Sequence, residues 1–109
     1  MFLIDSHCHL DRLDLTPYDN QLSNALTYAN EVGVGHMLCV AINMENFKAV
    51  IDTAKTYNFV SASVGVHPNE TDGHDPGTDE LIAMADDPDI VAIGETGLDY
   101  FRSEGDLTW

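Results

Sequence analysis

The sequence predicts an α/β fold built on a parallel sheet, and two observations carry the prediction. Four short apolar segments typical of strands alternate with three segments whose apolar residues recur at helical spacing. Residue types that bind metals gather after the strand segments, where parallel α/β folds place their sites. The periodicity alone does not choose between an open doubly wound sheet and a closed β/α barrel.

The predicted strands are short runs of apolar residues at positions 2–4, 37–42, 59–66 and 90–93. The second run is continuously apolar, which is typical of a strand buried on both faces. Pro68 turns the third run into a loop, and the fourth runs directly into a glycine-bounded segment at 94–97. Parallel strands need crossover connections, so each of the first three strands should be followed by a helix.

Capping residues mark the start of each predicted helix. Thr16 and Pro17 offer an N-cap and a first-turn proline for the first helix, which ends at Gly33. Asn43 can cap the second helix and Thr78 the third. The predicted buried stripes are Leu22, Ala25, Leu26 and Ala29 in the first helix, Phe47, Val50, Ile51 and Ala54 in the second, and Leu81, Ile82 and Ala85 in the third.

The chain is strongly acidic, with four basic and 19 acidic residues and a formal net charge of −15. This balance argues against a basic surface patch for nucleic acid. A phosphate ligand would be repelled at long range unless metal ions reverse the field locally. The hydrophobic content of 44% is that of a folded globular protein, and the length suits one small domain.

Both cysteines, Cys8 and Cys39, lie in strand-like segments, and we read them as reduced core thiols rather than a disulfide framework. No apolar run approaches the roughly 20 residues that a membrane helix needs. The apolar run at 2–4 is too short for a signal peptide and lacks a basic leader. We therefore expect a cytoplasmic protein that makes no membrane contact.

His7 and His9 follow the first apolar run and are the leading candidate metal ligands. Residues two apart on a strand share one face, so both imidazoles should project together while Cys8 points away. Glu95 follows the fourth strand between two glycines, and parallel strands bring it to the same rim. Two imidazoles and a carboxylate suit Zn²⁺ or Mn²⁺, whereas Mg²⁺ prefers more oxygen ligands.

Other residues leave more than one interpretation open. His36 should lie at the opposite end of the sheet, and His74 should be a surface residue in a polar loop. Tyr100 and Phe101 can stack on a base near the rim or be buried against a further helix. Arg102 can contact a phosphate or lie on the surface.

Three segments together resemble the TatD family, a group of metal-dependent hydrolases described as deoxyribonucleases within the larger amidohydrolase group. They are Asp5-Ser6-His7-Cys8-His9-Leu10-Asp11, Gly65-Val66-His67-Pro68 and Gly94-Glu95-Thr96-Gly97-Leu98-Asp99-Tyr100. All three occur in the expected order on the expected strands, and the resemblance covers essentially the whole chain.

The resemblance implies a (β/α)₈ TIM-type barrel with two divalent ions, Mg, Mn or Zn, at its C-terminal rim. His7 and His9 would be the first pair of metal ligands, and Glu95 would bridge the two ions. His67 would contact phosphate, and Asp99 would be an acidic catalytic residue beside the bridging Glu95. The implied reaction is hydrolysis of phosphodiester bonds in DNA by a metal-activated water.

The chain also departs from the family pattern, because no histidine follows His74 and further family ligands come from later strands. We therefore expect residues 1–109 to be a single partial domain, the N-terminal half of the barrel with four strands and three helices. One alternative is cleavage of an ester or amide such as a D-aminoacyl-tRNA. Another is a catalytically incompetent half-barrel whose exposed strand edges promote association; the oligomeric state is left open.

Overall fold

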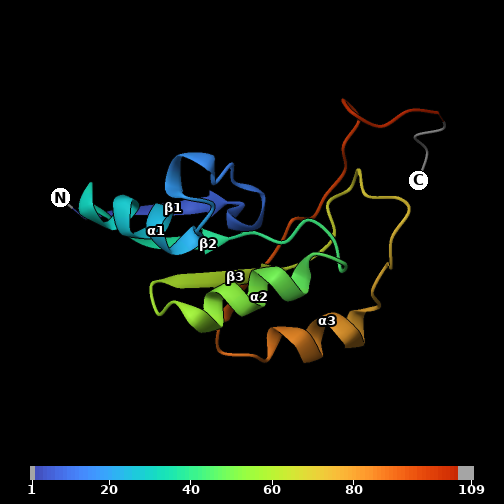
Figure 1. Cartoon of the computed structure of the whole chain (residues 1–109). Helices are drawn as coiled ribbons and strands as arrows, with labels where there is room; N and C mark the ends of the chain where they lie inside the picture. The colour runs from blue at the N-terminus through green and yellow to red at the C-terminus, as the bar shows by residue number, and fades with distance from the viewer. Residues whose placement is uncertain (1, 106–109) are drawn as a thin grey trace.

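The computed structural model describes residues 2–105, which form a parallel four-stranded sheet with helices between the strands (Figure 1). The strands lie in chain order, each paired in parallel with the next. Their bounds are β1 (Leu3–Cys8), β2 (Val34–Cys39), β3 (Val60–Val64) and β4 (Ile90–Ile93). All the strand ends that precede the candidate site residues therefore meet at one edge of the sheet.

The three α-helices are the crossovers between successive strands. They are α1 (Leu22–Glu31), α2 (Phe47–Thr56) and α3 (Thr78–Ala85). The connection from β1 to α1 also contains two 3₁₀ turns, η1 (Leu10–Arg12) and η2 (Thr16–Tyr18). α1 packs on β2, α2 on β3, and α3 on β3 and β4. Crossovers of one hand in a sheet of this order place their helices on the same face.

A small apolar core lies between the helices and the sheet. Leu26 of α1 and Val50 of α2 are buried against it, together with Cys39 of β2 and Val64 of β3. Burying a side chain of this size stabilises the fold by about 1.5–3 kcal/mol. This core holds the strands in register and so fixes where their C-terminal ends lie.

Both outer strands expose apolar side chains. Leu3 and Ile4 of β1 are exposed, as are Val91 and Ile93 of β4. Each outer strand also has one edge without a strand partner among residues 2–105. This confirms the α/β half-barrel expectation, because a sheet that continued into a closed barrel would cover these side chains.

The predicted start of the first helix at Thr16 and Pro17 is wrong. These residues form η2, and the chain then passes through Asp19 and Asn20, whose φ angles are 56° and 57°. Left-handed backbone cannot continue a right-handed helix, so α1 begins only at Leu22. The short polar side chains of aspartate and asparagine tolerate this conformation better than most residues.

Several other predicted boundaries are shifted by a few residues. β1 runs through the apolar positions to Cys8, so His7 and His9 lie at its end as predicted, and β2 spans Val34–Cys39 rather than 37–42. β3 is shorter than the predicted 59–66. The Asn43 side chain accepts a hydrogen bond from the backbone N–H of Asn46 in a turn that precedes α2. Thr78 is the first residue of α3, and Gly77 occupies its N-cap.

The prediction that Ile82 faces inward is also wrong, because its side chain is 63% exposed. Ile82 lies on α3 beside an apolar hollow that Ile93 of β4 also lines. Leu81 and Ala85 of the same predicted stripe do pack against the core. Among residues 2–105, no helix is long and apolar enough to span a membrane.

Candidate metal centre

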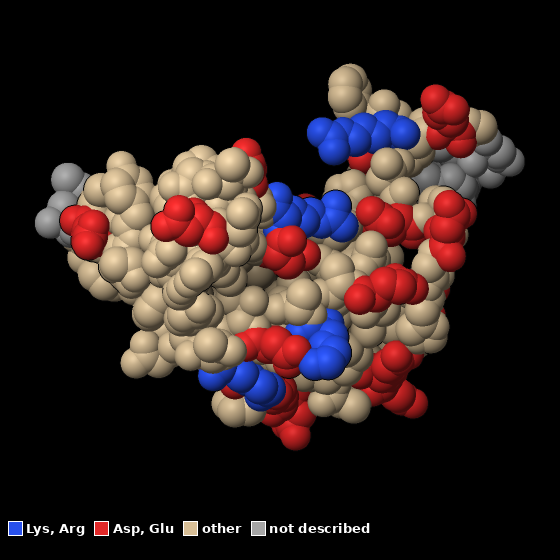
Figure 2. Space-filling view, in the orientation of Figure 1, with Lys and Arg blue, Asp and Glu red and all other residues tan. Residues whose placement is uncertain are grey.

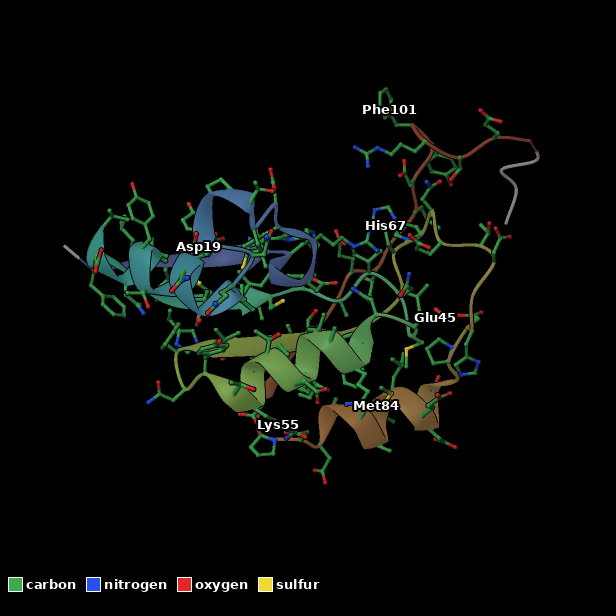
Figure 3. All side chains as sticks on the ribbon, viewed as in Figure 1. Asp19, Glu45, Lys55, His67, Met84 and Phe101 are labelled. Carbon is green, nitrogen blue, oxygen red and sulfur yellow. The ribbon has the colours of Figure 1, made fainter. Side chains whose placement is uncertain are left out.

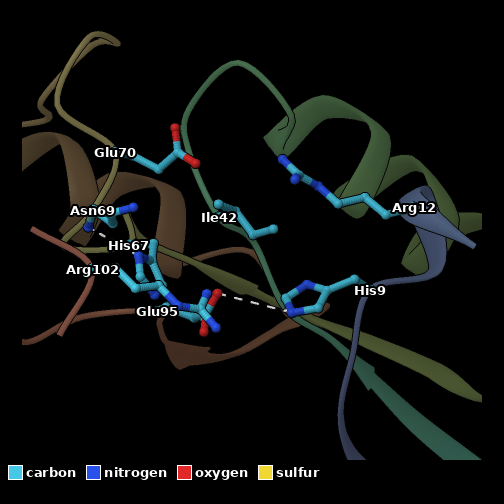
Figure 4. Close-up of a pocket in the computed structure, with 8 residues that line it drawn as sticks. All are labelled: His9, Arg12, Ile42, His67, Asn69, Glu70, Glu95 and Arg102. Atoms are coloured by element: carbon cyan, nitrogen blue, oxygen red, sulfur yellow. Dashed lines mark hydrogen bonds and ion pairs between the residues drawn. The ribbon is translucent and has the colours of Figure 1, made fainter. Parts of the chain in front are cut away.

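His7, His9 and Glu95 converge at the C-terminal edge of the sheet. One ligand atom from each lies within 4.8 Å of the other two. His7 Nε2 is 3.5 Å from Glu95 Oε1, and His9 Nε2 is 4.0 Å from Glu95 Oε2 (the latter pair is drawn in Figure 4). β1 and β4 are the first and last strands in the chain and the two outer strands of the sheet. The cluster therefore joins residues that are far apart in the sequence.

The two histidines share one side of the chain, as the strand alternation predicted. Their ring centroids are 5.1 Å apart, although His9 lies just after β1 ends. Cys8 points the other way, and its thiol donates to the backbone oxygen of Leu38. Burial raises the pKa of the Cys8 thiol to about 12, which disfavours the thiolate that metal binding needs. Cys8 and Cys39 are free thiols, as expected.

A backbone hydrogen bond sets which nitrogen of His9 is available. His9 Nδ1 lies 3.0 Å from the carbonyl oxygen of Val40, and a carbonyl can only accept. The proton of the neutral ring is therefore on Nδ1, which leaves the Nε2 lone pair facing Glu95. Imidazole ligands of metals are commonly oriented by such a bond on the second nitrogen.

The backbone around Glu95 is held by the ends of the two inner strands. The Glu95 N–H donates to the oxygen of Ala41, and the Gly94 N–H donates to the oxygen of Val64. The Gly94–Glu95 peptide bond is cis. Gly65 lies directly against this segment, because a Cβ placed on it would be 2.7 Å from the backbone oxygen of Glu95. The position of the carboxylate thus depends on close backbone packing.

Ser63 supports the same segment, and sequence reasoning missed it. Its side chain is 1% exposed, donates to the Gly94 oxygen and accepts from the Ala41 N–H. It therefore ties the end of β2 to the end of β4 across β3. The available signal was a pair of hydroxyls, Ser61 and Ser63, which alternate with the apolar core residues of β3 and so lie on the opposite face of the sheet, since buried polar groups are normally hydrogen-bonded.

His67 lies outside the three-residue cluster, beside a cavity of about 220 Å³ that shares His9 and Glu95 with it (Figure 4). Its backbone N–H donates to Ile42, and its Nδ1 accepts from the Asn69 N–H. Because Nδ1 is the acceptor, Nε2 of the neutral ring carries the proton and can donate to a ligand. Figure 3 shows His67 in the loop region beyond the strand ends.

The Asp99 side chain bonds the backbone of its own loop. Its Oδ1 accepts from the N–H groups of Phe101 and Arg102, which closes a turn after the glycine-bounded segment. Asp5 behaves similarly, accepting from the backbone N–H of His7 rather than from an imidazole.

The other histidines lie away from the cluster. His36 pairs in register with Ile4 near the start of β1, and its Nε2 is 2.8 Å from Ser61 Oγ. It therefore lies at the opposite end of the sheet, within β2 rather than at its first residue. His74 is exposed and faces Glu80, whose hydrogen bond raises the pKa of His74. Phe101 projects from the C-terminal loop and is exposed (Figure 3).

The donor set fits a divalent transition metal. The site offers two imidazole nitrogens and both oxygens of one carboxylate. Zn²⁺ and Mn²⁺ both bind this combination of nitrogen and oxygen ligands. His7, His9 and Glu95 are the residues that would hold such an ion. Each Glu95 oxygen faces a different histidine, an arrangement compatible with a carboxylate that contacts two ions.

Comparison with known proteins places the chain in a family. A family model described as TatD related DNase matches residues 4–108. The Escherichia coli K12 protein YcfH, described as an uncharacterized metal-dependent hydrolase, is 38% identical over 102 residues, which cover 93% of this chain and 38% of YcfH. The Salmonella typhimurium protein described as the 3'-5' ssDNA/RNA exonuclease TatD is 36% identical over 72 residues, 65% of this chain and 28% of the relative.

The fold agrees with this assignment. The crystal structure of the TatD homologue YjjV from E. coli K12 superposes with a TM-score of 0.75 at 32% identity, covering 91% of this chain and 38% of YjjV. The chain thus spans about two fifths of the length of such relatives. The parallel half-barrel, the matched residues and the sequence identity together show that this chain belongs to the TatD-related DNase family.

Proposed function

We propose that the complete protein carrying this sequence hydrolyses phosphodiester bonds of DNA with the help of divalent metal ions. The observation that carries the proposal is the convergence of His7, His9 and Glu95 beside a cavity that His67 also lines. The Salmonella relative is described as an exonuclease on single-stranded DNA and RNA, which supports a nucleic acid as the substrate.

In this proposal His7, His9 and Glu95 would hold the metal, with Glu95 as the ligand shared by two ions. A bound divalent ion would supply Lewis-acid polarisation of the phosphate and a water of lowered pKa. His9 keeps its Nε2 lone pair toward the metal position because Nδ1 is bonded to Val40. The acidic exterior meanwhile keeps non-specific attraction to DNA weak, since the cationic field is local.

His67 and Asp99 complete the proposed site. With its proton on Nε2, His67 donates to a non-bridging phosphate oxygen in the shared cavity. Asp99 is proposed as the further acidic residue of the reaction, and its bonds to Phe101 and Arg102 hold the loop beside the site.

We further propose that residues 1–109 are one partial domain and that later strands of the complete protein add the remaining ligands. The chain by itself then has little or no hydrolase activity. The two free thiols favour a reducing compartment, the cytoplasm, as the place where the protein works.

The test uses the complete protein with a labelled single-stranded DNA oligonucleotide and Mg²⁺, Mn²⁺ or Zn²⁺. We expect cleavage that EDTA abolishes and that Glu95→Gln lowers by at least about a hundredfold, because a metal-binding charge is lost. Glu31→Gln removes an equal charge from the exposed end of α1 and should leave the rate unchanged.

Two results would count against the proposal. Absence of metal-dependent cleavage with all three ions would refute it. If the protein hydrolysed a D-aminoacyl ester and not the oligonucleotide, the same site would be that of an ester hydrolase.

A further inference from the structure

The few cationic side chains of this acidic chain are distributed unevenly. The two lysines lie on α2 and are paired: Lys48 with Asp52, and Lys55 with Asp87 and Asp89. The two arginines, Arg12 and Arg102, both line the cavity that holds His67 and borders the metal cluster. Figure 2 shows basic side chains over α2, at the notch at the strand ends and on the loop above it, with acidic side chains in separate patches on the same face.

Separate structural elements position the two arginines on different sides of this cavity (Figure 4). The Arg12 backbone N–H donates to the His9 oxygen, so η1 places Arg12 directly beyond a metal ligand. The Arg102 N–H donates to Asp99, which anchors the loop after β4. Arg12 and Arg102 are far apart in the sequence, yet both line the same cavity.

Neither guanidinium is closely neutralised. Arg12 Nε is 4.0 Å from Asp11 Oδ2, and that oxygen already accepts from Asn46 at 2.7 Å. In residues 2–105, no carboxylate lies within the 4.0 Å ion-pair distance of Arg102. An arginine fork suits phosphate because it offers several donors in one plane. The two lysines, in contrast, already have carboxylate partners.

The size of the cavity limits what it can take. Its volume of about 220 Å³ is below the roughly 300–1,000 Å³ typical of pockets for drug-sized ligands. A phosphate group fits such a space, while the attached sugar and base remain outside. Donors from Arg12, Arg102, His67 and Asn69 surround it, and Glu70 and Glu95 are its carboxylates.

We propose that Arg12 and Arg102 clamp a backbone phosphate of the nucleic acid next to the phosphate being cleaved. This inference rests on the proposed function and adds how the substrate strand is held. The metal cluster takes the scissile phosphate, and the arginines take its neighbour. Contacts to phosphate position a strand without reading its bases, so the clamp is independent of sequence.

Glu70 provides an internal check on this clamp. It is exposed and lines the same cavity, so its negative charge opposes an anion held between the arginines. Neutralising Glu70 should tighten phosphate binding, whereas neutralising either arginine should weaken it. A general loss of fold would not produce two opposite effects from residues of one cavity.

The first experiment measures binding of a fluorescein-labelled oligothymidylate to the complete protein in EDTA, by anisotropy at several salt concentrations. Arg12→Gln and Arg102→Gln should each weaken binding about tenfold and make the slope of log K against log salt shallower by about 0.7. Lys48→Gln, an equal change of charge on α2, should alter affinity less than twofold, and Glu70→Gln should increase it.

The second experiment compares hydrolysis of the oligonucleotide with that of bis(4-nitrophenyl) phosphate, which has no neighbouring phosphate. The arginine variants should raise KM for the oligonucleotide and leave kcat/KM for the small diester within about twofold. Equal losses on both substrates, or unchanged oligonucleotide binding, would overturn the clamp. If the complete protein cleaves neither substrate, the proposed function fails, and the binding data still decide the clamp independently.

Discussion

Gly65 shows how strongly one residue without a side chain constrains the metal cluster. The backbone of Gly94 and Glu95 passes where a Cβ at position 65 would lie, with three backbone atoms at 2.7 Å. The buried side chain of Ser63 holds the same segment by donating to the Gly94 oxygen. The position of the Glu95 carboxylate therefore depends on contacts of Ser63 and Gly65, four and two residues before His67.

We predict that Gly65→Ala displaces the Gly94–Glu95 segment and weakens metal binding about 10–100-fold, the range for loss of an orienting contact. Overpacking at this contact should also lower the free energy of unfolding by about 1–3 kcal/mol. Calorimetric titration with Zn²⁺ and urea denaturation measure the two effects.

Gly77→Ala is the matched control, since nothing lies within 4 Å of a Cβ at that position. It should leave Zn²⁺ binding nearly unchanged, although the loss of a glycine N-cap on α3 should itself cost about 1 kcal/mol of stability. Equal effects of the two substitutions on Zn²⁺ binding would mean that close packing at Gly65 does not position Glu95.

At the scale of elements, the loop between β3 and α3 carries His67 and is tied down at its far end. The His74 imidazole lies 2.8 Å from Glu80 of α3, and the His74 N–H donates to Glu45 before α2. These bonds connect the loop to α3, which follows it, and to the turn before α2. Glu45, labelled in Figure 3, has its pKa lowered by the His74 N–H.

This contact predicts a pH dependence of the loop. Glu80 raises the pKa of His74, so the ion pair stabilises the folded loop fully below the unfolded pKa of about 6.5. That stabilisation is lost as the pH rises through the higher folded pKa. We expect protease cleavage within residues 66–77 to become faster across this interval, and NMR titration of His74 locates it.

Glu80→Gln should return the pKa of His74 toward its ordinary value and flatten the pH dependence of cleavage. Asp79→Asn, an exposed neighbour in the first turn of α3, should have a smaller effect on both. A His74 titration that does not respond to Glu80→Gln would contradict this assignment.

At the scale of the whole molecule, two properties have opposite effects on the association of one copy of the chain with another. The net charge of −15 repels other copies, while the apolar side chains of the outer strands attract them. Exposed strand edges are a known route to association. Screening by salt removes the repulsion first, because the apolar contacts do not depend on charge.

We therefore predict that residues 1–109 self-associate more strongly as ionic strength rises, as sedimentation velocity can measure. Val91→Lys should reduce this association, because it puts a charge on the outer strand at a position that is 60% exposed. Asn30→Lys adds the same charge on exposed α1 and should have less effect. Association that is independent of salt and of Val91 would contradict the prediction.

The order of elements and the metal cluster were predictable because each depends on local pattern and on strand topology. Apolar runs and helical spacing located every strand and helix, and parallel strands bring His7, His9 and Glu95 to one edge. Element boundaries were less predictable. The left-handed backbone at Asp19 and Asn20 moves the start of α1 to Leu22. Aspartate and asparagine are common in turns of many kinds, so their presence does not predict this conformation.

Composition and order thus predicted an acidic parallel half-barrel with a metal-binding rim, since hydrophobic periodicity and residue type act over a few neighbouring positions. Tertiary structure decided which side chains share a space. Ser63 reaches Gly94, Gly65 leaves room for Glu95, and Arg12 and Arg102, 90 positions apart, line one cavity only because β1 through β4 are packed in order. Contacts of this kind depend on distances between separate strands, which no local pattern encodes.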